Sequence, residues 1–172
     1  MTTGGLQRPE TWEENEVTIP EIPRPRKILV PFDGSKNAER ALAWSVLAAT
    51  NNDAEVVVVV AFDPPLTVRG RGAVYVEEMK ATLEGEARGL AEESVTILQG
   101  RGVTARGVVV RGDVARAILE TAEEESVELI VIGRQGVTHE MGDKLDRFRA
   151  LTSGGIAEKV SRHATVPVLV VV

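Results

Sequence analysis

The chain has 172 residues, of which 43% are apolar, 27% are charged and 3% are aromatic, and its formal net charge is −6. This balance is typical of one globular domain, while the acidic charge and the few aromatic rings argue against a nucleic-acid-binding surface. Cysteine is absent, which excludes disulfides and thiol catalysis; no apolar run approaches the roughly 20 residues that span a bilayer and no signal pattern opens the chain, so we expect a cytoplasmic protein without a membrane partner.

Residues 1–26 are expected to form an N-terminal extension outside the core, and residues 27–172 a single domain. The extension holds four of the eight prolines and shows no sustained helical or strand period. A loose or extended arm is the simplest interpretation. Four apolar side chains leave open that the arm docks on another surface: Trp12, Val17, Ile19 and Ile22.

The first strand is predicted at Ile28–Phe32, followed by a turn at Asp33-Gly34-Ser35. Ser35 is a suitable N-cap for a helix whose apolar residues recur at i, i+3 and i+4. This helix is expected to end at Asn51–Asp53. The next strand, Glu55–Phe62, contains five consecutive valines, which is typical of a strand buried on both faces of a parallel sheet.

The rest of the chain continues the alternation of strands and helices. A loop is expected at residues 66–73. The elements predicted after it are a helix at Val74–Gln99, a strand at Arg106–Val110, a helix capped by Asp113, a strand at Leu129–Ile132, a helix at Ile156–His163 and a strand at Val166–Val172. Strands joined by helical crossovers predict an α/β fold with a five-stranded parallel sheet and helices on both faces.

A glycine turn, Gly133-Arg134-Gln135-Gly136, directly follows the predicted fourth strand, and Gly154-Gly155 precede the last helix. Glycine turns let backbone N–H groups approach an anion, and a helix N-terminus adds unpaired donors and a positive dipole end. With the first strand central, Asp33 would face this turn across the crevice where the strand order reverses. We therefore predict a nucleotide, with phosphates at the glycines and Arg134 and a ribose hydroxyl at Asp33. The same glycines would also suit plain turns and a helix start.

Several segments, in the same order along the chain, resemble the universal stress protein family: Lys27–Ser35, Gly112-Asp113, Glu128–Gly133 and Pro167–Val171. The resemblance covers about residues 26–172. It implies a Rossmann-like sheet of strand order 3-2-1-4-5 and, usually, a dimer. The last predicted strand is apolar, uncharged and at the edge of the sheet, which independently favours a homodimer paired through it.

The ATP-binding branch of that family carries a motif of the form G-x2-G-x9-G-[S/T]. Gly133 and Gly136 match its first two glycines, Gly154 matches the third, and Gly155 stands at the Ser/Thr position. The resemblance implies an adenine-nucleotide site that consists of Pro31, Phe32, Asp33, Ala61, Ile132, Gly133, Arg134, Gly136, Gly154 and Gly155. Backbone groups near Ala61 would contact the base.

Two departures from the motif bear on function. Seventeen residues, Val137–Ser153, stand where the motif has nine, and Gly155 has no hydroxyl to reach a phosphate. Because the backbone donors survive both changes, we expect a stress-response sensor or regulator that binds ATP or a related adenine nucleotide together with Mg²⁺. Two alternatives stay open: a family member that binds no nucleotide and acts through protein contacts, and a slow ATPase.

No catalytic residue and no metal site built by the protein are predicted. No general base stands near the glycines in the sequence, so little or no hydrolysis is expected. His139, Glu140 and Asp143 can be drawn as metal ligands, but a solvated loop of mixed charge is the better interpretation of their segment.

Overall fold

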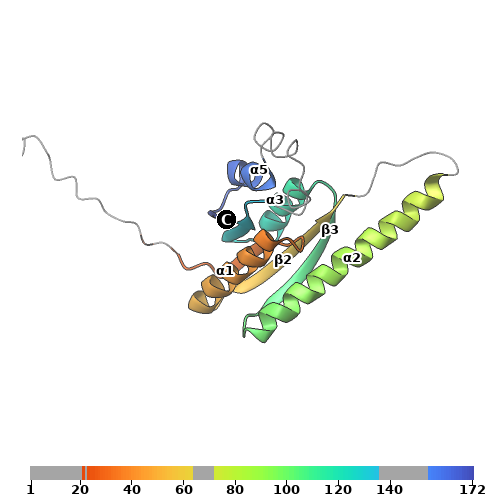
Figure 1. The fold of residues 1–172 in the computed structure, drawn as a ribbon. Helices are drawn as coiled ribbons and strands as arrows, with labels where there is room; N and C mark the ends of the chain where they lie inside the picture. Colours follow the sequence, from red (N-terminus) through yellow and green to blue (C-terminus); the bar gives the residue numbers. More distant parts are fainter. Residues whose placement is uncertain (1–20, 22, 64–71, 136–154) are drawn as a thin grey trace, which may run out of the picture.

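The computed structural model of the chain describes residues 21, 23–63, 72–135 and 155–172. In these residues five strands alternate with four helices (Figure 1). The elements are β1 (Lys27–Pro31), α1 (Lys36–Asn52), β2 (Glu55–Phe62), α2 (Gly72–Gly100), β3 (Ala105–Arg111), α3 (Val114–Glu124), β4 (Leu129–Gly133), α5 (Ile156–His163) and β5 (Val168–Val171).

The strands form one parallel sheet in the order β3-β2-β1-β4-β5, which confirms the predicted fold class and strand order. β2 lies between β1 and β3, with Val56 opposite Ile28 on one side and Ala105 on the other. Its five valines, Val56–Val60, are at most 3% exposed. Burial on both faces explains why this strand is a continuous apolar run and does not alternate with polar residues.

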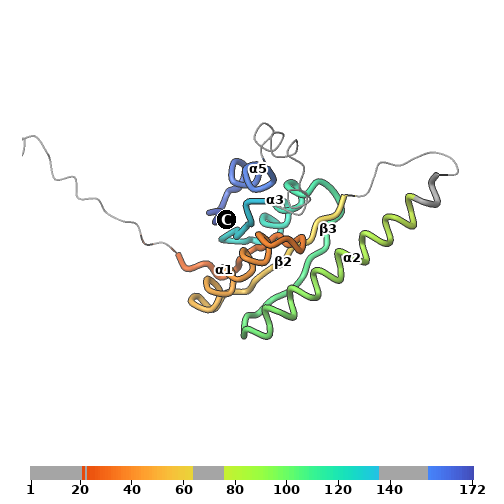
Figure 2. Tube along the Cα trace, viewed as in Figure 1, coloured from red at the N-terminus to blue at the C-terminus, as the bar shows by residue number. Residues whose placement is uncertain are grey.

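Helices cover both faces of the sheet, and the two layers can be followed in Figure 2. Successive side chains of a strand point to opposite faces. Val30 and Val58 therefore join α1 and α2 in one core, whereas Leu29 and Val59 join α3 and α5 in the other. The sheet is thus the middle layer of three, and its strand ends are left to carry loops.

Both predicted helix caps are present. The Ser35 hydroxyl accepts a hydrogen bond from the Ala38 N–H (3.1 Å), and the Asp113 carboxylate accepts one from the Arg116 N–H (2.9 Å). These contacts satisfy donors that the first turn of a helix leaves unpaired. α1 ends as predicted, at Asp53, whose left-handed backbone conformation (φ 53°) terminates the helix.

The observed ends of the elements differ from the predicted ones by at most two residues, and the last strand shows why. β5 covers Val168–Val171, not Val166–Val172. The Pro167 carbonyl still accepts a hydrogen bond from the Ile130 N–H (3.0 Å), but proline has no N–H with which to extend the ladder. The predicted loop at 66–73 is wrong at its end, because α2 already begins at Gly72; residues 66–71 lie outside the described residues.

Charged side chains join the amino ends of three strands. Arg106 on β3 pairs with Glu55 on β2 (Nε to Oε1, 2.8 Å) and with Glu125 at the end of α3, and Lys27 on β1 pairs with Glu125 (3.6 Å). The hydrogen bond from Arg106 lowers the pKa of Glu125 below its ordinary value, and the same contact raises the pKa of Arg106. This cluster lies at the opposite end of the strands from the loops considered next.

Candidate functional site

The candidate site lies at the carboxyl ends of β1 and β4. These two strands are neighbours in the sheet, and the strand order reverses between them. In open parallel sheets such a reversal opens a crevice in which ligands bind. The loop that follows β1 leads into α1, and the loop that follows β4 begins with Arg134 and Gln135.

The loop after β1 is a tight turn built by its own side chains. The Asp33 carboxylate accepts a hydrogen bond from the Ser35 N–H (3.0 Å), and Gly34 has a positive φ of 78°, which glycine adopts without strain. Ser35 then caps α1. Asp33 therefore has a structural role, which is to position the start of α1. This role is separate from the ligand contact predicted for the same residue.

Gly133 lies where the end of β4 meets the first turn of α1. A methyl group added at Gly133 would lie 2.7 Å from the backbone carbon and oxygen of Asn37, a distance too short for any real contact. Glycine is therefore needed here for close packing of a strand on a helix. The sequence predicts a role for Gly133 in binding an anion; the packing reason depends on the position of Asn37, which is distant in the sequence.

Arg134, in the glycine turn after β4, lies close to Gly155, in the glycine pair before α5. Among the described residues, a methyl group added at Gly155 would have the Arg134 carbonyl oxygen, 3.9 Å away, as its nearest neighbour. The Arg134 N–H donates to the Val171 carbonyl (2.8 Å) and so belongs to the sheet, while its side chain is exposed. An exposed guanidinium at this point is the part of Arg134 that can pair with an anion.

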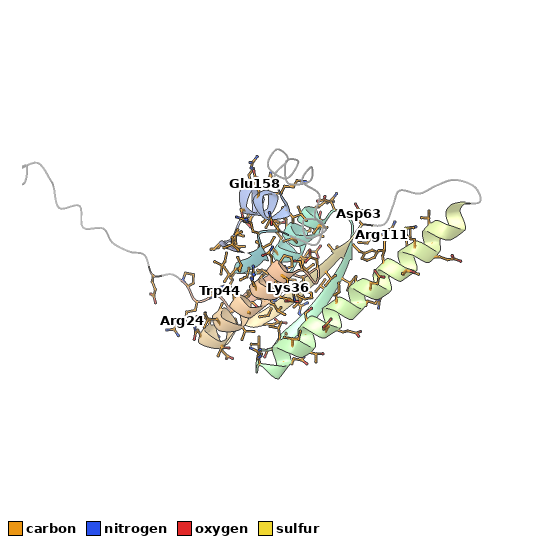
Figure 3. The ribbon with its side chains drawn as sticks, in the orientation of Figure 1. Arg24, Lys36, Trp44, Asp63, Arg111 and Glu158 are labelled. Atoms are coloured by element: carbon orange, nitrogen blue, oxygen red, sulfur yellow. The ribbon has the colours of Figure 1, made fainter. Side chains whose placement is uncertain are left out.

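Gly155 is the N-cap of α5. Its backbone is extended (φ −63°, ψ 171°), and glycine supplies no side-chain hydrogen bond to cap the helix. Within the described part of the chain, the first N–H groups of α5 thus have no side-chain acceptor, and the positive end of the helix dipole points out of the N-terminus. Glu158 stands in this first turn (Figure 3), where its carboxylate pairs with Arg162 (2.8 Å) on the next turn. The helix start is suited to a negatively charged group.

The sequence model of the universal stress protein family matches residues 25–172. The chain belongs to the universal stress protein family. Universal stress protein YxiE of Bacillus subtilis is 30% identical over 152 residues, which are 84% of this chain and 97% of that protein. The solved structure of MJ0577 from Methanocaldococcus jannaschii has a TM-score of 0.71 and 29% identity, and the match covers 85% of this chain and 94% of that one.

Two further similar structures are nucleotide complexes. A universal stress protein in complex with cAMP has a TM-score of 0.64 and 22% identity, with 87% of this chain and 99% of that chain covered. The universal stress protein from Archaeoglobus fulgidus in complex with dAMP has a TM-score of 0.58 and 22% identity, with 85% and 97% covered. At these identities the likeness shows the shared fold of the family.

The other predicted site residues of this universal stress protein are of two kinds. The side chains of Phe32 and Ile132 are 6% and 4% exposed and belong to the two cores, so their backbone is the part next to the crevice. Pro31 and Ala61 are half-buried at the carboxyl ends of β1 and β2. The predicted site residues Gly136 and Gly154 lie outside the described residues, and so does the insertion at 137–153.

Two features of the described residues concern metal ions and membranes. Among the described residues, no three His, Cys, Asp or Glu side chains gather as ligands for a metal ion. Within the same part of the chain, none of the helices combines the length and apolar character needed to cross a membrane. The predicted ligands His139, Glu140 and Asp143 lie outside the described residues.

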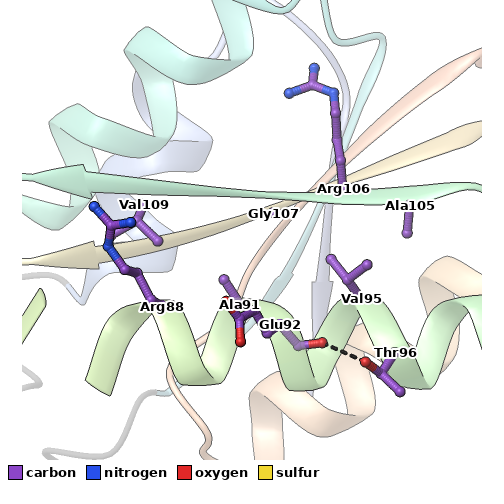
Figure 4. A pocket seen from close by; sticks show the side chains of 9 residues that line it. All are labelled: Arg88, Ala91, Glu92, Val95, Thr96, Ala105, Arg106, Gly107 and Val109. Atoms are coloured by element: carbon purple, nitrogen blue, oxygen red, sulfur yellow. Dashed lines mark hydrogen bonds between the residues drawn. The ribbon is translucent and has the colours of Figure 1, made fainter. Parts of the chain in front are cut away.

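The sequence did not predict a groove of about 800 Å³ between α2 and the edge strand β3 (Figure 4). Ala91 and Val95 of α2 and Ala105, Gly107 and Val109 of β3 are among its lining residues. The one signal in the sequence is Gly107, a glycine inside a strand, since a methyl group there would lie 3.0 Å from the Ala91 Cβ. The groove lies beyond β2, away from the crevice between β1 and β4.

Proposed function

We propose that this universal stress protein binds ATP or a related adenine nucleotide in the crevice between β1 and β4, as a stress-response sensor or regulator in the cytoplasm. The observation that carries the proposal is the uncapped start of α5 at Gly155, adjacent to the Arg134 loop at the reversal of the strand order. Similar structures in complex with cAMP and dAMP support an adenine nucleotide as the ligand.

Different residues of the crevice bind different parts of the nucleotide. The first N–H groups of α5 and the Arg134 guanidinium bind phosphates, and Asp33 accepts a hydrogen bond from a ribose hydroxyl. Mg²⁺ would enter with the nucleotide, held by the oxygens of its triphosphate. His163, the one histidine that the structure describes, lies in the last turn of α5, where its ring contacts the Lys159 carbonyl. This is the far end of the helix from Gly155, so His163 is not placed to act as a general base for rapid hydrolysis.

Titration with a fluorescent ATP analogue and Mg²⁺, followed by anisotropy, tests the proposal. The double variant Asp33→Ala with Gly136→Val is expected to weaken binding, because it removes the ribose acceptor and places a side chain in the glycine loop. Asp113→Ala is the matched control, since Asp113 is also an acid at a strand-to-helix turn but follows the edge strand β3. No binding at millimolar analogue, or binding equal in the wild type and the double variant, would overturn the proposal.

A second candidate function is regulation through protein contacts without any nucleotide. Gly155 favours it, because a glycine N-cap supplies no hydroxyl at the position where the ATP-binding motif has Ser or Thr. Denaturing the freshly purified protein and measuring released nucleotide by mass spectrometry separates the two candidates. Released ATP or AMP supports the nucleotide; a preparation free of nucleotide that also fails the titration supports the second candidate.

We further propose that the protein is a homodimer paired through β5. This edge strand carries no charge, and Leu169 and Val170 are each 38% exposed. An uncharged apolar edge pairs readily with another strand, and a two-fold pairing with its own copy closes it. Light scattering at micromolar concentration is expected to give the mass of a dimer for the wild type and of a monomer for Val170→Lys. A wild-type monomer would refute the pairing.

A further inference from the structure

The outer face of α1 carries an exposed apolar pair. The helix turns Ala38, Ala41, Leu42, Ser45 and Ala49 towards the core. Arg40, Trp44 and Leu47 follow one another at spacings of four and three residues, so they form one stripe on the solvent side, here called the outer stripe. Trp44 is 51% exposed and Leu47 is 53% exposed. Trp44 and Leu47 together offer an apolar surface on which another segment can pack.

The N-terminal extension joins the body of the protein at the end of α1. The Glu55 N–H donates to the Arg26 carbonyl (2.9 Å), and Glu55 lies three residues beyond the last residue of α1. Figure 3 labels Arg24 on this segment and Trp44 on α1. Twenty residues precede the first described residue, which at roughly 3.3 Å per residue reach up to about 65 Å, whereas α1 with its 17 residues is about 26 Å long. The extension can therefore run back along the whole of α1.

The chemistry of the two segments is complementary. Between Pro9 and Pro23 the extension has no Lys, Arg or His, and residues 10–19 combine four glutamates with Trp12, Val17 and Ile19. The outer stripe combines two apolar side chains with one cation. Arg40 donates a hydrogen bond to the Asn37 side chain (3.2 Å) and forms no ion pair within the described residues. An acidic, apolar segment suits a basic, apolar stripe.

We propose that residues 10–19 of the chain's own N-terminal extension pack on the outer stripe of α1. The apolar residues of the extension cover Trp44 and Leu47, and its glutamates lie near Arg40. The extension thereby becomes part of the folded domain and shields the one tryptophan of the domain from solvent.

Tryptophan fluorescence tests this in the full chain, because the only two tryptophans are Trp12 and Trp44. In Trp12→Phe, Trp44 is the sole reporter and phenylalanine keeps an apolar side chain on the extension. Adding Val17→Asp and Ile19→Asp in that background is expected to raise acrylamide quenching of Trp44 about two-fold or more, as a covered indole becomes as open as the bare stripe. The reciprocal chain, Trp44→Phe, reports on Trp12, whose quenching is expected to rise with Leu47→Asp.

The charge contact has its own matched pair of variants. Arg40→Glu in the Trp12→Phe background is expected to raise the quenching of Trp44, whereas Arg116→Glu, which reverses an exposed arginine on α3, is expected to leave it unchanged. Quenching of Trp44 that is already high and does not respond to the changes in the extension would overturn the proposal. Protection of Trp44 that disappears on dilution would also overturn it, because a second copy of the chain would then be what covers the stripe.

Discussion

Replacing Gly155 by serine is the sharpest test of whether the start of α5 holds a phosphate. The backbone of this position suits a side chain, since its φ of −63° and ψ of 171° are ordinary for serine. Among the described residues, the nearest neighbour of an added Cβ is the Arg134 carbonyl oxygen at 3.9 Å. The change restores the hydroxyl that the ATP-binding motif carries at this place. It also gives α5 a side-chain N-cap, which relative to glycine stabilises the protein by only a few tenths of a kcal/mol.

The expected effect on affinity is much larger than the effect on stability. A hydrogen bond to a charged group contributes about 1.5–3 kcal/mol, and about 1.4 kcal/mol corresponds to a factor of ten in Kd. Gly155→Ser is therefore expected to tighten the binding of an ATP analogue by roughly 10- to 140-fold. Isothermal titration calorimetry with Mg²⁺ measures Kd, and urea denaturation of the free protein measures the capping contribution separately.

Gly155→Ala is the control, because it adds the same Cβ without a hydroxyl. It is expected to leave Kd unchanged. Equal Kd values in the wild type and Gly155→Ser would refute the reasoning, since a serine at the N-cap of α5 would then have no phosphate within reach. Equal tightening by alanine and serine would refute it as well, because the gain would come from the backbone of position 155 and not from a hydrogen bond.

Three further predictions concern stability. Gly133→Ala is expected to destabilise the fold by about 1–3 kcal/mol in urea denaturation, with or without nucleotide, because its Cβ would overlap the α1 backbone. Gly85→Ala and Gly89→Ala, on the exposed and open side of α2, are each expected to raise the free energy of unfolding by about 0.8–1 kcal/mol. A decrease of the size expected for Gly133→Ala would contradict this. Arg106 lowers the pKa of Glu125, so their contact stabilises the folded state above the unfolded pKa of Glu125, and this stabilisation is lost as the pH falls through the folded pKa. Between about pH 7 and pH 3, the free energy of unfolding should therefore fall less steeply in Glu125→Gln than in the wild type.

The fold could be predicted from the sequence because its local signals agree with one another. Five consecutive valines mark the buried strand β2, and Ser35 and Asp113 mark the starts of two helices through contacts that span only three residues. Such contacts depend on neighbours in the chain and are visible in the sequence. The predicted extent of β5 is wrong at both ends, because it depends on which backbone groups of Pro167 and its neighbours find partners on β4.

The candidate site was only partly accessible to the same reasoning. The strand order that places the proposed site is confirmed, and Gly155 lies close to Arg134, but the site itself stays a prediction. The roles of single residues did not follow. The closeness of Gly133 to Asn37, and of Gly107 to Ala91, depends on elements that are distant in the sequence and meet only in the folded protein.

The two ends of the glycine motif are therefore under different physical constraints. Gly133 is required by the contact between β4 and α1 whether or not a ligand binds, so its presence says little about a nucleotide. Position 155 has an ordinary backbone conformation and, among the described residues, room for a side chain, so nothing in that part of the chain demands a glycine there. A substitution at position 155 therefore tests a contact with a ligand separately from the packing of the fold. We therefore expect the proposed nucleotide binding to depend more on what position 155 and Asp33 offer a ligand than on how many glycines the motif retains.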